Sequence, residues 1–351
     1  MSLSIIDLFS GIGGLSLGFR SVGFNVLMAN EIDSEIALAY KNNHPMTKMI
    51  ISDISKMDIK NIFHEYKGKV DGIIGGPPCQ GFSQKGQRNT LLDDRNYLFL
   101  YFYKTVEYIK PNFFVMENVP NFFTTEMGYY KDEIIRLFGK IGYAIAFEIL
   151  NSSDYGIPQN RRRAIVIGNL SDRKIEMPKP SHEKVCVWDA ISDLAFLESG
   201  EGLFKQNYKF ESISEYQKLL RKNSLILYNH VATKHSPIAL ERLSMIPPEG
   251  GKEFLPKEHL TKSIYSGTWS RIDKNGISVT ITTRFDTPSS GKFTHPYLNR
   301  TITVREAARI QSFPDNFIFY GTKSSQMKQV GNAVPPFLAK HIALSIKRQL
   351  Y

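Results

Sequence analysis

Short apolar runs alternate with amphipathic stretches over the first 170 residues of the chain. The runs are rich in β-branched and aromatic residues, and several are apolar throughout, which is typical of strands covered on both faces of a sheet. The predicted strands are 3–9, 25–31, 48–53, 70–76, 112–118, 143–150 and 164–169. Helical spacing between them predicts helices over 14–23, 34–43, 95–109 and 130–142. This alternation predicts an α/β fold with a doubly wound, mostly parallel sheet.

The regular rhythm ends near Pro178. Residues 179–300 contain scattered Gly, Pro and Ser, which is typical of an irregular, loop-rich module. Helical spacing returns at 303–313 and 335–350. The expected parts are a main domain over 1–178 and 327–351, a smaller irregular domain over 179–300, and a connecting segment over 301–326.

Composition places the chain among ordinary globular proteins, with 42% hydrophobic and 22% charged residues. No apolar run approaches the roughly 18 residues of a membrane span, and the N-terminus lacks a basic leader, so we expect neither a membrane segment nor a signal peptide. Cys79 and Cys186 do not suggest a disulfide framework, which favours a reducing cytoplasm. The eight histidines show no metal-ligand spacing, so no metal is predicted.

The chain is basic, with a formal net charge of +10. Residues 181–351 carry 23 Lys and Arg against 15 Asp and Glu, so most of the surplus lies there. Such a balance favours a polyanionic partner, such as nucleic acid, although charge alone does not identify one.

One of the two cysteines, Cys79, lies in an unusual loop, "GGPPCQGFSQKG", over 75–86. Pro77 and Pro78 remove backbone donors and fix their own φ, while the glycines let another group approach the main chain. Such a loop presents a side chain rigidly at a surface. The alternative is a turn that contains a buried packing thiol.

Chemically distinctive residues follow five of the predicted strands. In an open parallel sheet, ligands bind beyond the carboxyl ends of the strands. In strand order, the residues found there are the glycine turn 11–14, Glu31, Asp53, Cys79, and Glu117-Asn118. This series predicts a site along that edge of the sheet.

The glycine turn departs from the dinucleotide fingerprint, because Ser16 occupies the position of the third glycine. Glu31 lies 20 residues after Gly11, where a carboxylate would hold ribose hydroxyls. These residues favour a nucleoside ligand without a pyrophosphate, such as S-adenosylmethionine. The alternative is a glycine turn that only lets a helix pack closely.

In these motifs the chain resembles the C5-cytosine DNA methyltransferase family, in the family's order and across nearly the whole length. The nucleophile loop and the strand end "ENV" are highly specific, whereas the glycine turn alone is not. The matching motifs are "DLFSGIGG" (7–14), "GGPPCQGFS" (75–83), "ENV" (117–119), "QNRRR" (159–163), "RTITVREAARIQSFPD" (300–315) and "QVGNAVPP" (329–336).

The resemblance implies a Rossmann-like methyltransferase fold and a covalent mechanism. Cys79 would add to C6 of cytosine, which turns the ring into an enamine that takes a methyl group at C5. Glu117 would hold N3 and the exocyclic amine of the cytosine. Asn118 follows it at the same strand end and belongs to the same catalytic motif. Arg163 would hold O2, and Arg161 and Gln159 would order the loops around it. A structural Glu117–Arg163 ion pair is the alternative for those two residues.

The resemblance also implies S-adenosylmethionine as the cofactor. The residues that match the family's cofactor positions are Phe9, Gly11, Ile12, Gly13, Gly14, Glu31, Ile32, Asp53, Ile54, Gly76, Pro78, Leu98, Asn332 and Val334. Ile32 departs from relatives that carry an aromatic residue against the adenine.

For DNA, the resemblance implies that the cytosine is flipped out of the duplex, because the chemistry cannot reach a stacked base. Residues 179–300 would be the target-recognition domain, 301–326 a hinge, and 1–178 with 327–351 the catalytic and cofactor domain. Thr280-Ile281 resembles the family's recognition dipeptide. Ser83, Gln84, Lys85 and Arg88 are candidates to contact phosphate or fill the gap left by the base, or to be solvated loop residues. Candidates to read guanine or contact phosphate are Arg271, Arg284, Lys292 and His295.

Three rival functions were weighed. Transfer-RNA cytosine methyltransferases usually carry a Cys-Phe-Thr tripeptide, and neither cysteine here is followed by Phe-Thr. A catalytically silent DNA-binding relative is disfavoured because Cys79, Glu117 and Arg163 are all present. A nicotinamide-dependent oxidoreductase is disfavoured by Ser16. The preferred hypothesis is a monomeric, cytoplasmic bacterial methylase, associated with the nucleoid through DNA, with a restriction endonuclease encoded nearby as a candidate partner.

Overall fold

The described residues form two compact units. The computed structural model describes residues 3–78, 98–124, 129–170, 175–181, 183–263 and 265–350. Unit 1 contains Met1–Asn151, Arg162–Pro180 and Leu338–Tyr351, and unit 2 contains Ser152–Arg161 and Ser181–Phe337.

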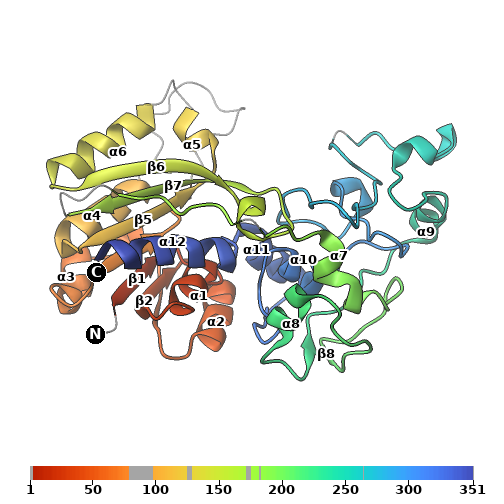
Figure 1. The fold of residues 1–351 in the computed structure, drawn as a ribbon, viewed down its shortest axis with the longest axis horizontal. Helices are drawn as coiled ribbons and strands as arrows, with labels where there is room; N and C mark the ends of the chain where they lie inside the picture. Colours follow the sequence, from red (N-terminus) through yellow and green to blue (C-terminus); the bar gives the residue numbers. More distant parts are fainter. Residues whose placement is uncertain are drawn as a thin grey trace. The chain divides into compact units, whose positions relative to one another are not determined.

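Within its described residues, unit 1 is built on a seven-stranded sheet (Figure 1) of order β3-β2-β1-β4-β5-β7-β6. The strands are β1 Ser4–Leu8, β2 Asn25–Glu31, β3 Lys48–Ile51, β4 Gly72–Gly75, β5 Phe113–Asn118, β6 Ala144–Asn151 and β7 Arg162–Asn169. The first five are parallel, while β7 runs antiparallel to both β5 and β6. All seven predicted strands are confirmed, and so is the mostly parallel α/β sheet.

Helices cover both faces of this sheet. The α-helices of unit 1 are α1 Gly14–Arg20, α2 Ser34–Asn43, α3 Ile59–Phe63, α4 Leu98–Ile109, α5 Asn121–Thr124, α6 Tyr129–Lys140 and, from Leu338 onward, α12 Pro336–Leu350. The short 3-10 helices are η1 Ile54–Lys56 and η2 His64–Tyr66. On one face, Phe102 of α4 and Phe138 of α6 pack with Phe114 of β5 into the main apolar core.

The C-terminal helix α12 completes unit 1. Its apolar side chains Leu338, Ile342 and Ile346 are buried. Lys347 Nζ donates a hydrogen bond to the carbonyl of Val22 at 2.7 Å, which ties the helix to the turn after α1. Sequence segments more than 300 residues apart therefore share one core.

Local sequence explains where α2 begins. Asp33 is its N-cap, and the carboxylate accepts hydrogen bonds from the N–H groups of Glu35 and Ile36. Side chains Ile36, Ala37 and Tyr40 recur at helical spacing and are buried. Because such a cap is typically worth ~1 kcal/mol, Asp33 fixes the start of α2 directly after the site residues at the end of β2.

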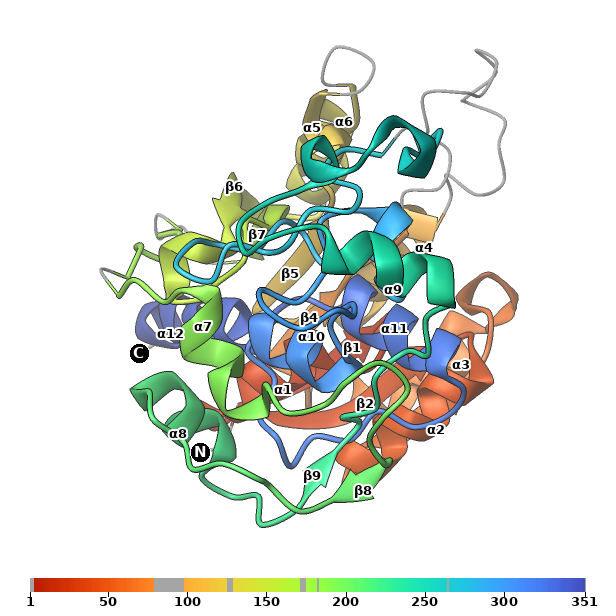
Figure 2. The ribbon, with the colours of Figure 1, turned by 90° about the vertical axis from the view of Figure 1, so that its right-hand side faces the viewer.

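Unit 2 consists of short helices joined by long loops (Figure 2). Its α-helices are α7 Val187–Ile191, α8 Glu215–Arg221, α9 Pro237–Ser244, α10 Val304–Ile310 and α11 Lys323–Asn332. Its 3-10 helices are η7 Ser152–Tyr155, η8 Ser192–Leu194, η9 Lys252–Phe254, η10 Lys257–His259 and η11 Pro288–Ser290, and its two short strands are β8 Lys205–Gln206 and β9 Leu227–Tyr228. The helix predicted over 303–313 is α10, whereas the sequence pattern did not predict α7, α8, α9 or α11.

The compact units differ from the expected domain boundaries at three places, one of which is residues 179–180, expected in the smaller domain but part of unit 1. Residues 152–161 and 327–337, expected in the main domain, belong to unit 2. The reason lies in hydrogen bonds: Arg161 donates from Nη1 to the carbonyl of Ile281 and from Nη2 to that of Gly331, at 3.1 and 2.7 Å. The roles given to the domains remain proposals.

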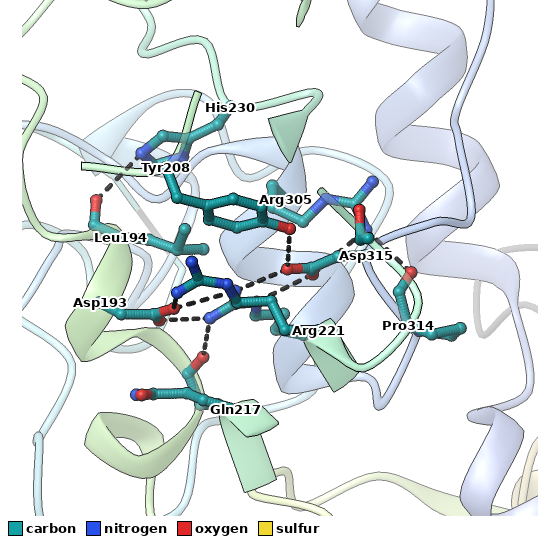
Figure 3. A network of polar contacts seen from close by, with 12 residues as sticks. Asp193, Leu194, Tyr208, Gln217, Arg221, His230, Arg305, Pro314 and Asp315 are labelled. Atoms are coloured by element: carbon teal, nitrogen blue, oxygen red, sulfur yellow. Dashed lines mark hydrogen bonds and ion pairs between the residues drawn. The ribbon is translucent and has the colours of Figure 1, made fainter. Parts of the chain in front are cut away.

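Unit 2 is held together by buried charges as much as by apolar contacts (Figure 3). Arg309 of α10 donates to the carboxylates of Asp193 and Asp315, and all three side chains are fully buried. Arg221 Nη1 reaches Asp193 Oδ2 at 3.1 Å, and the hydroxyl of Tyr208 donates to Asp315 Oδ2 at 2.7 Å. Because every carboxylate here has several donors, burial of the charges is compensated.

Two histidines of unit 2, His230 and His295, are fully buried. His230 bonds the carbonyl of Leu194 and the hydroxyl of Thr303, and His295 Nδ1 accepts from the N–H groups of Tyr297 and Leu298. Burial lowers the pKa of His230 to about 4 and that of His295 to about 3. Both rings are therefore neutral in the folded protein at neutral pH.

We expect the free energy of unfolding to fall as pH is lowered from 7.5 to 5.5. The unfolded histidines, with pKa near 6.5, take up protons that the folded rings do not, which costs about 1.4 kcal/mol per ring over this range. Thermal unfolding at both pH values measures the effect. His295→Asn, whose Oδ1 can accept the same backbone hydrogen bonds, should show the shallower pH dependence. An equal slope in parent and variant would contradict the role assigned to His295.

Candidate active site

The carboxyl ends of β1 to β5 meet at one edge of the parallel sheet, and most of the predicted site residues of unit 1 lie there. The turn 9–14 follows β1, Glu31 ends β2, Asp53 follows β3, 76–78 follow β4, and Glu117-Asn118 end β5. The strand register of the fold, rather than closeness in sequence, aligns them.

The turn after β1 has an unusual backbone. Phe9, Gly11 and Gly13 all have positive φ, at 56°, 54° and 91°. For a bulky residue such as Phe9 this conformation is rare and strained, and such strain is found mainly at functional sites. Gly13 could not be replaced, because a Cβ there would lie 2.6 Å from the side chains of both Tyr40 and His44.

Glu31 is fixed against this turn. Its Oε2 accepts a hydrogen bond from the N–H of Gly11, and its Oε1 accepts from the N–H groups of Ile32 and Asp33, each at 2.9 Å. Burial raises the pKa of Glu31, while these N–H groups act in the opposite direction. Next to it, the side chain of Ile32 is 65% exposed, which leaves an apolar surface beside a fixed carboxylate.

Asp53 and Ile54 begin η1. Asp53 Oδ1 accepts hydrogen bonds from the N–H and hydroxyl of Ser55, and the hydroxyl bond lowers the pKa of Asp53. The side chain of Ile54 is buried in the core of unit 1, so only its main chain can face a ligand. Leu98, at the start of α4, is half-buried.

Glu117 and Arg163 form an ion pair, with Arg163 Nε 2.7 Å from Glu117 Oε1. The antiparallel pairing of β5 with β7 sets this contact, because Glu117 and Asn118 stand opposite Ile165 and Ala164. Both charged side chains remain slightly exposed, at 12% and 13%. Gly76 lies close by, since a Cβ there would come within 2.9 Å of Glu117 Oε2.

Asn118 connects this pair to the segment that precedes Cys79. Its Nδ2 donates to the carbonyl of Pro77 at 2.9 Å, and its Oδ1 accepts from the N–H of Val119. The end of β5 thus fixes the main chain two residues before Cys79. Cys79 itself lies outside the described residues, as do Ser83, Gln84, Lys85 and Arg88.

The remaining predicted residues lie in unit 2. Gln159 Oε1 accepts from the N–H of Ile281 at 2.8 Å, and the hydroxyl of Thr280 donates to the carbonyl of Asn160. With the bonds from Arg161 described above, these contacts hold the Thr280-Ile281 dipeptide from both sides. Gln159 and Arg161 are almost fully buried, Asn332 is exposed at the end of α11, and Val334 is buried.

Comparison with known proteins agrees with this arrangement. The family model for C-5 cytosine-specific DNA methylase matches residues 3–348.

The chain belongs to the C-5 cytosine-specific DNA methylase family.

Curated relatives cover nearly the whole chain. Type II methyltransferase M1.HphI of Haemophilus parahaemolyticus is 40% identical over 352 residues, which span 99% of this chain and 87% of the relative. Type II methyltransferase M.DdeI of Desulfomicrobium norvegicum is 38% identical over 372 residues, covering 97% and 88%. A crystal structure of a prophage-encoded E. coli protein assigned as a DNA modification methyltransferase superposes with a TM-score of 0.81, at 31% identity and 99% coverage of both chains.

As a member of this family, the protein is a DNA (cytosine-5)-methyltransferase. The match confirms the resemblance and the enzyme class and excludes the oxidoreductase alternative. In the part of the chain that the structure describes, no cluster of three or more His, Cys, Asp or Glu could hold a metal ion. Helices long and apolar enough to cross a bilayer are likewise absent from the described residues.

Two candidates for DNA contact in the methyltransferase prove to be structural. Arg271 is 3% exposed, and its guanidinium is bonded to main-chain carbonyls. His295 is fully buried and accepts backbone hydrogen bonds. Neither side chain can read a base in this conformation. Arg284 is exposed, and Thr280 and Lys292 are half-buried, so these three side chains can still reach DNA.

One residue of the site was missed from the sequence. Asp7 of β1 is fully buried, its Oδ2 accepts from the hydroxyl of Ser16 at 2.6 Å, and Ser16 in turn contacts the hydroxyl of Tyr40. Its Oδ1 has no partner among the described residues. Burial raises the pKa of Asp7 to about 7. The available signal was a carboxylate between Ile6 and Leu8 in an apolar strand.

The acids along this edge decide which class of ligand fits. Glu31 places a fixed carboxylate against the glycine turn, and Asp53 lies at the same edge after β3, so a pyrophosphate would be repelled there. At this edge a fixed carboxylate, Glu31, and an exposed apolar side chain, Ile32, therefore lie next to each other. Ser16 is occupied by Asp7 and Tyr40, which explains why no third glycine is needed there.

Proposed function

We propose that this protein transfers a methyl group from S-adenosylmethionine to C5 of a cytosine flipped out of duplex DNA. The observation that carries the proposal is the Glu117–Arg163 pair, held at the end of β5 beside the segment that leads into Cys79. A purely structural ion pair would need neither the glycine at 76 nor the rigid prolines beside it. The cofactor supplies an electrophilic methyl group.

In this mechanism the Cys79 thiolate adds to C6, and the electrons of the C5–C6 double bond become available at C5. Glu117 would hold a proton on N3 and accept a hydrogen bond from the exocyclic amine, and so offset the negative charge that the ring gains as Cys79 adds. Arg163 donates to O2 while its contact with Glu117 keeps both groups oriented. After methylation the C5 proton leaves, and the C6–S bond breaks to return the thiolate.

Glu31, Asp53 and the turn 9–14 are proposed to bind the cofactor, together with Ile32, Ile54, Gly76, Pro78, Leu98, Asn332 and Val334. Fixed carboxylates and exposed main-chain groups along one edge support this assignment. The nucleoside part would be held by Glu31, whose carboxylate is prevented from turning by three N–H groups.

Glu31→Ala should weaken binding of S-adenosylhomocysteine about 10- to 100-fold, because hydrogen bonds to a charged group typically contribute ~1.5–3 kcal/mol. Isothermal titration calorimetry measures the affinity, and the rise in melting temperature on binding gives a second readout. Glu35→Ala, which removes an exposed acid four residues further on, is the matched control. Unchanged affinity in Glu31→Ala would remove this residue from the cofactor site.

The biological setting proposed is modification within a Type II restriction system, because the relatives M.DdeI and M1.HphI are Type II methyltransferases. The partners would be duplex DNA and a cognate endonuclease. The enzyme would act as a monomer in the bacterial cytoplasm, with unit 2 selecting the target sequence.

Bisulfite sequencing of plasmid DNA tests the function directly. Plasmid is recovered from a host without cytosine C5 methylation that expresses either the parent protein or Cys79→Ala. The parent should protect the cytosine of one short sequence from conversion, and the variant should protect none. A parent that leaves every cytosine convertible would contradict the proposal.

A further inference from the structure

Arg271 is an unusual residue of unit 2, because its guanidinium is buried and its hydrogen-bond partners among the described residues include no carboxylate. The side chain is 3% exposed and donates five hydrogen bonds, four of them to main-chain carbonyls. The acceptors are the carbonyls of Leu243, Ile246, His295 and Leu298 and the side-chain oxygen of Asn299. Burial lowers the pKa of Arg271, yet a guanidinium stays charged at neutral pH.

These bonds join segments that are distant in sequence. Leu243 and Ile246 provide carbonyls at the C-terminus of α9, where a cation is favoured by the helix dipole. The other acceptors belong to the turn 295–299. The main chain of Arg271 contacts a further segment, because its N–H donates a hydrogen bond to the carbonyl of Gly250 at 2.9 Å. Three segments therefore converge on this one residue.

The segment 237–263, called here the α9 arm, has a small apolar core of its own. Leu243, Ile246 and Leu255 pack against Trp269. The indole N–H of Trp269 donates to the hydroxyl of Thr261, and Trp269 has a positive φ of 63°, which is rare for a bulky residue. The backbone around Arg271 is thus held in place by several independent contacts.

The α9 arm exposes charged and apolar side chains of the kinds that contact phosphates and bases in nucleic-acid interfaces, but it is not a basic patch. Its exposed lysines and apolar residues, Lys252, Phe254, Lys257, Leu260 and Lys262, are accompanied by the exposed acids Glu241, Glu249, Glu253 and Glu258. Arg271 and Trp269 connect the arm to the rest of unit 2.

From Arg271 the chain continues for nine residues to the recognition dipeptide. There the N–H of Ser278 donates to the carbonyl of Pro158, and the N–H of Ile281 donates to Gln159 Oε1. One end of this stretch is thus fixed to the α9 arm and the other to the segment before Arg163. The placement of the arm relative to the dipeptide depends on both attachments.

We propose that Arg271 is a positioning residue for target selection, which holds the α9 arm and the turn 295–299 in register with Thr280-Ile281. The inference rests on the proposed function, since it concerns which DNA sequence unit 2 accepts. Base readout requires side chains to be placed accurately, and a mismatched pair typically costs on the order of 10- to 100-fold in binding. Loosening the arm should therefore reduce discrimination before it abolishes methylation.

Arginine is required here for reach as well as charge. Its planar fork donates in several directions at once, toward α9 on one side and the turn on the other, whereas a lysine ammonium is a single point. Arg271→Lys should keep the charge and lose part of the network. Asn299→Ala removes one acceptor and leaves the arginine in place, and so provides a milder second variant.

The test compares methylation at the preferred site with methylation at sites that differ by one base pair. Parent, Arg271→Lys, Arg271→Ala and Asn299→Ala are incubated with plasmid and S-adenosylmethionine, and bisulfite sequencing gives kcat/KM at each site. Arg242→Met is the control, because Arg242 lies over Trp269 in the same arm, with its guanidinium 5.2 Å from the ring centroid. Binding of S-adenosylhomocysteine reports whether unit 1 is intact.

We expect the ratio of preferred to near-matching sites to fall about tenfold in Arg271→Lys, while cofactor binding and the Arg242→Met ratio stay unchanged. If Arg271→Ala does not fold, Arg271→Lys and Asn299→Ala decide. A ratio that stays constant while all rates fall together would show a purely structural role and overturn the inference. A parent enzyme that methylates no site would instead contradict the proposed function.

Discussion

Replacing Cys79 by serine is expected to abolish methyl transfer while leaving duplex binding in place. A hydroxyl is far less ionised than a thiol at neutral pH, so it cannot add to C6 at a useful rate. A duplex with 5-fluorocytosine at the target provides the measurement. Fluorine cannot leave as a cation, so the parent enzyme should remain covalently joined to the DNA through denaturing electrophoresis, whereas Cys79→Ser should trap nothing.

Cys186→Ser is the matched control for this experiment. Cys186 caps the start of α7, its N–H donates to Asp189 Oδ2, and burial raises the pKa of its thiol. A thiol of that kind is a poor nucleophile, so the variant should trap DNA as the parent does. Trapping that survived loss of Cys79 and disappeared with Cys186 would overturn the assignment of the nucleophile.

Glu117→Gln should lower turnover by ~10²–10⁴-fold, the usual contribution of a general acid–base group. The amide keeps the shape of the side chain and one hydrogen bond to the base, but it removes the carboxyl group that stabilises the ring during attack. It also weakens the contact with Arg163. Single-turnover methylation measures the rate, and gel shift measures affinity for the duplex, which should change little.

Glu148→Gln is a close control for this prediction. In the sheet, Glu148 of β6 and Glu117 of β5 both stand opposite Ile165 of β7, one on each side, and Glu148 is exposed. Its replacement should leave the rate unchanged. If Glu117→Gln lost duplex affinity and kept its rate per bound complex, Glu117 would be a structural residue.

The central strands of unit 1 were predictable because they are buried on both faces and therefore form continuous apolar runs in the sequence, whereas the edge strands β3 and β6 are only partly buried. The direction of β7 was not predictable, since an apolar run does not specify whether it pairs parallel or antiparallel. Helix α11 was missed for another reason: Ser325 and Gln329 are polar yet buried, and Gln329 is bonded to the carbonyl of Tyr320. Met327 and Val330 are the large apolar side chains on its buried face, so the apolar pattern is too short to predict a helix.

The arginines of unit 2 were only partly a guide to the surface that contacts DNA. Arg300, Arg305 and Arg309 are fully buried, and so is almost all of Arg271. Their guanidinium groups are satisfied by carbonyls and carboxylates that come from distant parts of the chain, and no sequence pattern reveals such partners. The number of arginines therefore overstates how many are available to DNA, while the buried acids Asp193, Glu306 and Asp315 offset most of the charge of the buried arginines.

The site residues also differ in how far the sequence could predict them. Glu31 and Glu117 were predictable because strand ends can be located from the pattern, and an acid at that place stands out. Asp7 was not, because it lies inside a strand where burial is the rule. Its role depends on Ser16 and Tyr40, which reach it only through the packing of α1 and α2.

The three-segment construction of unit 1 has a consequence for synthesis on the ribosome. Helix α12, whose buried Leu338, Ile342 and Ile346 complete this unit, is translated only after all of unit 2. At about 5–20 residues per second, making residues 181–337 takes roughly ten to thirty seconds. During that interval the nascent sheet lacks its last covering helix, so an apolar face stays open to chaperones and to other nascent chains.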